Sequence, residues 1–492
     1  MRPVHLVPAG VVLLALGAIA AVAQLTSPAA PGPGQASMVP RQVAVTSAVR
    51  ACPPVPGGGP GQVAFIAGPP AASPSGASGQ AALAPVPLAG AALRALSPIS
   101  AAGPGALSVL TIPAAQSTVK NATTVLQGWS VTASGTMAQA LEAEEATSAG
   151  LASVRCGEPG SDIWFVGAGS QGGAAQVQLD LMNIDALPAS VDVDVITDAG
   201  LVQSGGDTAI TVPPHQAVTE SLSSSAAGST VVAIEMRTSI GRVAADVSQS
   251  SRDGTARWLP STAPPSTQLV IPGVPPSGST AGLYIVVPGS ANARISVLAI
   301  TAQGHYHPFG TQTVDLPADS ASYVPLASLG GTAALELTAN VPVTAAVRVP
   351  GSGLGTYTAA TTPISEQAVI AGNTAGAGLS ATIVLSAPAG PVRVRLTEMA
   401  ATAGATSSQV VTVPAGHTLT APATLPRPLG NTAAHGSAFA LVITPLAGSG
   451  PLCAARVETQ GQNTVVSIIP AVSALTTITL VPAHDSYDAI SP

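Results

Sequence analysis

The chain has 492 residues, which is enough for about three domains, and its 46% of hydrophobic residues are ample for packed cores. Only 8% of the residues are charged and 2% are aromatic, so the cores must be built from Val, Ile, Leu and Ala, and global disorder is disfavoured. The net charge of −7 and the single lysine, Lys120, leave no basic cluster for phosphate groups, which argues against nucleic acid as a partner.

The N-terminus carries an export pattern. Arg2 and His5 precede an uncharged stretch from Leu6 to Leu25, and Ala21-Val22-Ala23 offers a small-x-small cleavage site. The apolar run also approaches the ~20 residues that cross a bilayer. We therefore expect residues 1–25 to be a signal peptide or a membrane anchor, with both alternatives open. Residues 26–51 are predicted to be a Pro/Gly/Ala-rich spacer, and the remainder to be extracytoplasmic, either secreted or anchored to the cytoplasmic membrane by the N-terminal segment.

The three cysteines are too far apart in sequence for a Cys-x-x-Cys metal or redox site. In an oxidising compartment, one disulfide and one spare thiol is the simplest arrangement. Three pairings exist, and Cys52–Cys156 is favoured because both residues precede the repeats described below. Cys453 lies in an apolar, strand-like run and is expected to be a buried thiol.

Residues 52–161 give a weaker pattern. The first half is rich in Gly, Pro and Ala, and Met137 to Ala146 contains helix-forming residues but also allows an extended conformation. We expect an irregular or incomplete β-region here.

From Asp162 onward the sequence repeats about every 100 residues. Each repeat has a strand-like run, then a strand that ends in proline, then a strand with an Ala-Ala pair. The prolines are Pro213, Pro317 and Pro414, and the pairs begin at Ala244, Ala345 and Ala454. Apolar residues alternate within the repeats, and Gly, Pro, Asn and Ser clusters punctuate them, which is typical of antiparallel sandwiches.

The predicted fold class is therefore all-β, with tandem antiparallel β-sandwich repeats after an N-terminal apolar helix and a Pro/Gly-rich spacer. The predicted repeats span residues 162–260, 261–350 and 351–480, and residues 481–492 form a disordered tail.

Several motifs resemble those of an actinobacterial family of exported, membrane-tethered proteins known only as a domain of unknown function. The motifs are Cys156 to Gly167, Trp258-Leu259-Pro260 followed by Val270 to Pro275, and Val341 to Val347. The resemblance covers about Cys52 to Thr477 and implies an extracytoplasmic protein with sandwich-like repeats. It implies no activity and no catalytic residues.

Two motifs suggest ligands but have simpler explanations. Gly167 to Gly172 matches G-x-G-x-x-G, yet a dinucleotide site requires a helix next, and the following residues alternate as a strand, so a hairpin loop is the better interpretation. His305 and His307 share one face of a strand, but a metal site needs further ligands, and we expect them on an exposed hairpin tip.

The acidic residues and tryptophans have structural explanations too. The acidic run Glu142, Glu144 and Glu145, and the pair Asp192 and Asp194, are expected to be solvated surface rather than a catalytic pair. The three tryptophans have apolar neighbours, as core residues do, although exposed tryptophans would suit sugar binding. They are Trp129, Trp164 and Trp258.

The sequence predicts no enzyme, no catalytic residue, no cofactor and no metal. The leading hypothesis is a non-catalytic cell-envelope scaffold or interaction protein, whose partner is a cell-wall polymer or another exported protein, with the membrane as a further partner if the N-terminal segment is retained. The alternatives are a carbohydrate-binding accessory module for an envelope enzyme, with Trp129 or Trp258 in the site, and an unrecognised exported enzyme.

Overall fold

The structure is a computed structural model of the whole chain. The residues that it describes are 41–68, 79–90, 99–101, 103–112, 127–147, 152–202, 209–276, 281–351, 353–374, 379–400, 404–423, 438–461 and 464–480. The predicted signal peptide or anchor, most of the predicted spacer, and the predicted tail lie outside these residues.

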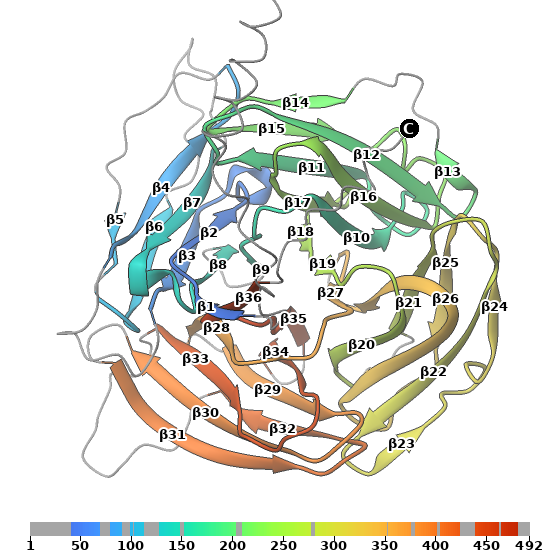
Figure 1. Cartoon of the computed structure of the whole chain (residues 1–492). Coiled ribbons are helices and arrows are strands. Elements are labelled where there is room, and N and C mark those ends of the chain that lie inside the picture. Colours follow the sequence, from blue (N-terminus) through green and yellow to red (C-terminus); the bar gives the residue numbers. More distant parts are fainter. Residues whose placement is uncertain are drawn as a thin grey trace, which may run out of the picture. The chain divides into compact units, whose positions relative to one another are not determined.

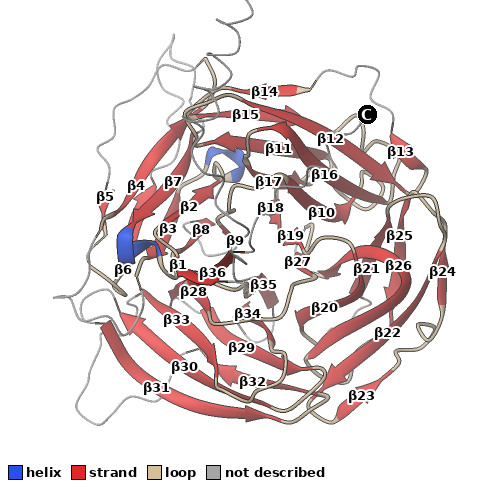
Figure 2. Cartoon of the chain, in the orientation of Figure 1, coloured by secondary structure: helices blue, strands red, loops and turns tan. Residues whose placement is uncertain are grey.

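The regular secondary structure of the described residues is almost entirely β-strand (Figure 2). The only described helices are two short 3-10 turns, η1 (Pro56–Gly58) and η3 (Gly135–Ala138). No helix of the described chain has the length and apolar character that a membrane span requires. The predicted all-β class is confirmed, while the predicted N-terminal apolar helix falls outside the described residues.

The chain divides into two compact units. One comprises residues 1–43 and 478–492, and the other, called unit 2 below, comprises residues 44–477. A two-stranded sheet is formed by β1 (Arg41–Ala44) and β36 (Thr477–Leu480).

The sheets of unit 2 form four sheet pairs, numbered 1 to 4 along the chain, and all four share one strand order. In each pair, sheet I places the first, sixth, third and fourth strands side by side, and sheet II places the fifth, second, seventh and eighth strands side by side. Neighbouring strands are antiparallel in these sheets. This order repeated four times shows that the pairs are internal repeats.

Pair 1 has its sheets in the order β2-β7-β4-β5 and β6-β3-β8-β9. Its strands are β2 (Ser47–Cys52), β3 (Gly61–Ile66), β4 (Ala81–Pro87), β5 (Ile99–Ser100), β6 (Leu107–Ile112), β7 (Gln127–Ser134), β8 (Glu142–Thr147) and β9 (Ser153–Arg155).

Pair 2 splits its fourth strand into β13 and β14 and adds β19 beside β10. Its strands are β10 (Asp162–Ala168), β11 (Gln176–Asn183), β12 (Ala189–Thr197), β13 (Gly200–Val202), β14 (Ile210–Val212), β15 (Gln216–Ser221), β16 (Val231–Ile240), β17 (Ala244–Ser250), β18 (Ala256–Leu259) and β19 (Ser261–Thr262).

Pair 3 uses one long strand, β26, as both its sixth and its seventh strand, so its two sheets are joined. Its strands are β20 (Ser266–Val274), β21 (Ala281–Val287), β22 (Ala293–Thr301), β23 (Gly304–Tyr306), β24 (Val314–Leu316), β25 (Ser320–Leu326), β26 (Ala333–Val349) and β27 (Thr356–Ala359).

Pair 4 has the orders β28-β33-β30-β31 and β32-β29-β34-β35. Its strands are β28 (Ala368–Thr374), β29 (Leu379–Ala387), β30 (Val392–Ala400), β31 (Gly404–Val413), β32 (His417–Pro422), β33 (Ala438–Pro445), β34 (Cys453–Gln460) and β35 (Thr464–Pro470).

Alternating residues fill the core of each pair. In β30, Val392, Val394 and Leu396 are buried, whereas Arg393 and Arg395 between them are exposed, as the period of two predicts. In the seventh strand of each pair, one alanine side chain points into the core of that same pair. These residues are Ala143, Ala245, Ala345 and Ala454.

The pairs also pack on one another, so that many strands are buried on both faces. Sheet II of each pair packs on sheet I of the pair before it, through the contacts of β15 with β4, β26 with β10 and β34 with β20, and β8 of pair 1 closes the cycle against β28 of pair 4. β-Propellers use a comparable cyclic stacking, which leaves few sheet edges.

The sequence suggested three repeats, and the described residues form four. Residues 52–161, expected to be irregular or incomplete, contain most of pair 1, which has both sheets. Its repeat is hidden because the seventh strand carries Glu142-Ala143-Glu144 in place of the Ala-Ala pair. Part of the predicted spacer is also strand, since β1 and β2 begin at Arg41 and Ser47.

Candidate functional site

The eighth strands of the four pairs meet at one cavity. β9, β18, β27 and β35 lie together in the middle of unit 2 (Figure 1), and β9 contacts both β18 and β35. The cavity that they line, with residues of β10, β17 and β19, has a volume of about 210 Å³. At roughly 30 Å³ per water molecule, such a space holds several waters or one small organic molecule.

The four repeats contribute different side chains at one equivalent position of the wall. In each pair, the eighth strand is hydrogen-bonded to the seventh strand. The equivalent position is the residue of the eighth strand that pairs with the third residue after the core-facing alanine of the seventh strand. The residues at this position are Ser153 in β9, Trp258 in β18, Tyr357 in β27 and Ile468 in β35. Repetition of the fold therefore gives a chemically asymmetric cavity.

Two indole groups of the wall are buried without a hydrogen-bond partner. Trp164 in β10 is 3% exposed and Trp258 in β18 is 5% exposed, and neither Nε1 atom has a partner among the described residues. An indole N–H can only donate a hydrogen bond. A buried donor without an acceptor costs about 1–3 kcal/mol. Other atoms cover both Nε1 atoms, and the Nε1 of Trp129 in the core of pair 1 likewise has no partner among the described residues.

Arg257, the neighbour of Trp258, adds a buried cation to the wall. Its Nε donates to the carbonyl of Gly355 at 3.3 Å and its Nη1 to the carbonyl of Ala256 at 3.4 Å. No ion pair joins it to a carboxylate among the described residues. Burial lowers the pKa of Arg257, but a guanidinium keeps its proton in proteins. The positive charge of Arg257 is thus compensated only by backbone carbonyls.

Three buried carboxyl groups lie near the cavity, where sheet II of pair 2 packs on pair 1. Asp180 in β11 is directly opposite Asp246 in β17, and Glu145 comes from β8. Desolvation, with repulsion from the neighbouring carboxyls, raises the pKa of Glu145 and of Asp246 well above the ordinary range. Burial likewise raises the pKa of Asp180 to about 6, although the Thr219 hydroxyl donates to its Oδ1 at 2.6 Å.

Of these three carboxyls, Asp246 lines the cavity, and its Oδ2 has no partner among the described residues. Its raised pKa favours the neutral acid, so Asp246 places little negative charge in the cavity and can itself donate a hydrogen bond.

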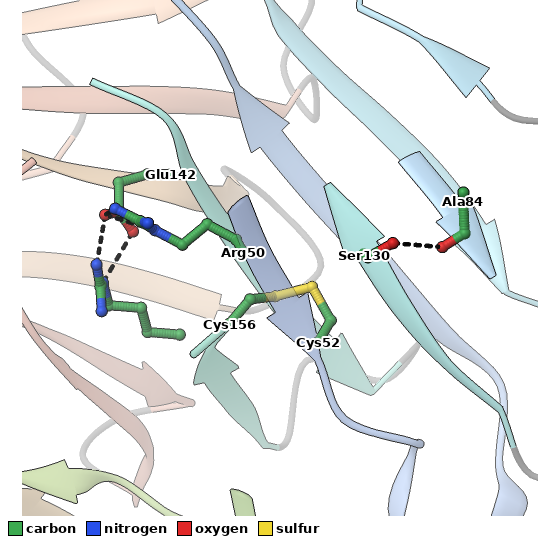
Figure 3. The surroundings of a disulfide bond; sticks show 7 residues. Arg50, Cys52, Ala84, Ser130, Glu142 and Cys156 are labelled. Atoms are coloured by element: carbon green, nitrogen blue, oxygen red, sulfur yellow. Dashed lines mark hydrogen bonds and ion pairs between the residues drawn. A yellow bond between two sulfur atoms is a disulfide. The ribbon is translucent and has the colours of Figure 1, made fainter. Parts of the chain in front are cut away.

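The charged residues on the pair 1 side are already paired (Figure 3). Glu142 accepts hydrogen bonds from Arg50 Nη2 at 3.0 Å and from Arg155 Nε at 2.8 Å. Arg50 Nη1 lies 3.4 Å from Glu158 Oε2. Arg155 and Glu158 belong to the cavity wall, and these contacts neutralise both of them.

The disulfide lies beside this cluster. Cys52, at the end of β2, is bonded to Cys156, just after β9 (Figure 3). It links sheet I of pair 1 to the segment that follows sheet II, and so fixes the chain where β9 enters the cavity wall. The third cysteine, Cys453, is free and buried, as expected.

A second charged cluster joins pair 4 to pair 1. Arg456 in β34 is fully buried and forms an ion pair with Glu144 in β8. Its Nη1 donates to the carbonyl of Gly372 at 2.8 Å and its Nη2 to the Ser153 hydroxyl at 3.0 Å. Glu144 Oε2 in turn accepts from the Gly372 N–H at 3.1 Å. This cluster therefore closes the cycle of sheet pairs directly behind the cavity.

The expectation of a solvated acidic run is wrong for Glu142, Glu144 and Glu145, which are all buried. They lie in β8, which is covered by pair 4 on one face and by the pair 1 core on the other. Asp192, by contrast, is exposed, and Asp194 forms an ion pair with Arg237.

The remaining sequence candidates lie away from the cavity. His305 and His307 are exposed, and His307 Nδ1 is 2.8 Å from the Val297 carbonyl. No group of three or more metal-type ligands is found within the described segments. The Gly167 to Gly172 loop joins β10 of sheet I to β11 of sheet II, so it is a connection between sheets and not a hairpin.

All three tryptophans are buried, as expected of core residues, but their surroundings differ. Trp129 packs in the core of pair 1, whereas Trp164 and Trp258 line the cavity.

Sequence reasoning missed Arg257 and Asp246. One signal was present, because in a chain with 8% charged residues each falls inside an apolar, strand-like run. The two residues lie on β17 and β18, which are neighbours in one sheet, and the stacking of the sheet pairs forms the cavity beside them.

Residues 111–424 match the model of a family of unknown function, DUF5719, and the chain belongs to this family. No curated protein and no solved structure matches the chain.

Proposed function

We propose that the chain is a non-catalytic, extracytoplasmic interaction protein of the cell envelope, and that the central cavity is its binding site. The observation that carries this proposal is a cavity walled by strands of all four sheet pairs, in which Arg257 is buried with incomplete hydrogen bonding and without a countercharge among the described residues. Buried polar groups are normally satisfied, and those that are not are candidates for ligand contacts.

The surroundings suit binding by a preformed site. β-Strands form the wall of the cavity. The charged cluster around Arg456 fixes these strands on one side, and the disulfide fixes them on the other. A rigid site loses little conformational entropy when a ligand binds.

The disulfide also supports an oxidising location outside the cytoplasm. The apolar run from Leu6 to Leu25 suggests export, either as a cleaved signal or as a retained anchor, and cell-wall polymers or other exported proteins are the partners that this location offers.

The test is co-sedimentation of the full-length chain with purified cell-wall material. Ser261 is exposed and lines the rim of the cavity, so Ser261→Trp should fill the entrance without disturbing a core. Ser221→Trp, at the exposed end of β15, is the matched control.

We expect saturable binding by the parent and by Ser221→Trp, and at least a tenfold loss in Ser261→Trp. Equal binding by all three proteins would refute a role for the cavity. Conversion of the wall material by the parent would refute the non-catalytic assignment.

A carbohydrate-binding accessory module is the second candidate, favoured by two tryptophans in one cavity. Trp129 has no place in it, because its indole lies in the core of pair 1. This candidate predicts that a neutral saccharide fragment of the wall competes with the intact wall for the cavity. Failure of every neutral fragment to compete would exclude it.

A further inference from the structure

The cavity wall contains a guanidinium with unused hydrogen-bond donors. The guanidinium of Arg257 has five N–H groups, of which two donate to backbone carbonyls at 3.3 and 3.4 Å. The Nε1 atoms of Trp164 and Trp258 also have no partner in the described structure, but other atoms cover them, so they are not open to the cavity. The remaining N–H groups of Arg257 favour a ligand that carries acceptors.

The charge of the wall has the same implication. Arg155 is paired with Glu142, and Glu158 is paired with Arg50. Asp162 is exposed to solvent at the cavity rim. Arg257 is therefore the buried charge of the wall that lacks a countercharge in the described structure, and a charge buried in this way is favourable only when an opposite charge joins it.

We propose, on the premise that the cavity is the binding site, that it takes a small organic anion whose carboxylate or phosphate oxygens pair with Arg257. A planar guanidinium suits both groups, because it can donate two parallel hydrogen bonds to a carboxylate or a phosphate. The volume of about 210 Å³ limits the ligand to about the size of one sugar ring.

The neutral acid at Asp246 is consistent with this assignment. Burial raises its pKa well above the ordinary range, so the carboxyl opposes an incoming anion little. The apolar part of the wall, including Val154 and Ile468, would contact the body of the ligand.

The experiment is titration calorimetry of the full-length chain with three probes of similar size. Glucuronate carries a carboxylate, glucose 6-phosphate carries a phosphate, and glucose carries neither. We expect at least one anion to bind and glucose to bind at least tenfold more weakly, because a hydrogen bond to a charged group contributes about that factor. The stronger anion identifies which oxyanion the site prefers.

The variants are chosen to separate binding from folding. Arg257→Met should weaken anion binding at least tenfold, and Arg257→Lys, which keeps the charge but loses the paired N–H groups, should weaken it about threefold to tenfold. Arg294→Met is the matched control, because Arg294 is an exposed arginine paired with Asp315, and it should bind like the parent. If Arg257→Met fails to fold, Arg257→Lys still tests the inference.

The inference is overturned if neither anion binds at 10-millimolar concentrations (roughly the weakest useful affinity), if glucose binds as tightly as the anions, or if Arg257→Lys and Arg257→Met bind like the parent. Cell-wall binding that Ser261→Trp abolishes and Arg257→Met leaves intact would overturn the anion assignment while the proposed function stands. Loss of the proposed function is recognised separately, by equal wall binding of the parent and Ser261→Trp.

Discussion

Replacing Asp180 by Asn should stabilise the protein at neutral pH and have little effect in acid. The pKa of Asp180 is about 6 in the folded chain against an ordinary value of 3.8. Below pH 3.8 the carboxyl is protonated in both states. As the pH rises from 3.8 to 6, the unfolded chain ionises first, so folding loses free energy, and above 6 the loss is complete. At 1.36 kcal/mol per pKa unit, that loss is about 3 kcal/mol.

The assay is urea unfolding followed by tryptophan fluorescence, at pH 4 and at pH 7.5, with the disulfide intact. Asp180→Asn keeps an oxygen that can accept the Thr219 hydrogen bond, so the variant should gain up to about 3 kcal/mol over the parent at pH 7.5 and little at pH 4. Asp192→Asn is the control, because Asp192 is an exposed carboxyl of the same sheet pair. The charge of Asp180 also raises the pKa of Glu145 and of Asp246, so the difference between variant and parent includes the relief of these two neighbours. The reasoning is refuted if the stability of Asp180→Asn changes with pH as that of the parent does.

Four further outcomes follow from the same structure. Arg456→Met leaves Glu144 buried without its cation, and urea unfolding should show a loss of about 3–5 kcal/mol. A Cβ at Gly372 would lie 2.9 Å from the Glu144 carboxyl, so Gly372→Ala should cost about 1–3 kcal/mol in the same assay, whereas Gly330→Ala, with open space around it, should cost under 1 kcal/mol. Removing the disulfide, which spans 104 residues of sequence, should lower the free energy of unfolding by about 4–5 kcal/mol, measured on the double serine variant. Burial raises the pKa of Cys453 to about 12, so iodoacetamide should label it in urea and leave it unlabelled in the native protein at pH 8, as mass spectrometry will show.

The sequence was sufficient for those features that depend on a single strand or a single repeat. The alternation of Val392, Val394 and Leu396 with arginines identifies a strand with one buried face, and the structure has that burial pattern. Three sequence features that recur in the same order showed that the chain is repetitive. They did not identify pair 1 as a repeat, because acidic residues replace the alanine pair there.

The errors concern contacts between the sheet pairs. Glu142 and Glu144 have the sequence pattern of a solvated strand, but their outer face is covered by β28 of pair 4, whose residues come more than 200 positions later. Strands that are far apart in the sequence can pack as closely as sequence neighbours do. The hydrophobic pattern of one strand therefore does not show which other strand covers its outer face. The cavity was invisible for the same reason, since its wall takes strands from all four pairs.

The placement of the few charges suggests what determines the order of the pairs. The faces through which the pairs stack are built mainly from small and aliphatic residues. Ala217 and Val86 share one buried cluster, and Val457 and Val343 share another. Faces that are so similar distinguish the correct neighbour only weakly, because apolar packing is not directional. At the closing contact, however, Glu144 meets Arg456, and a buried charge placed against a wrong face would lack its counterion, at a cost of several kcal/mol. In this interpretation the ion pair between Glu144 and Arg456 contributes to the specificity of stacking more than to net stability. It lies at the contact between pair 4 and pair 1 that also completes the cavity.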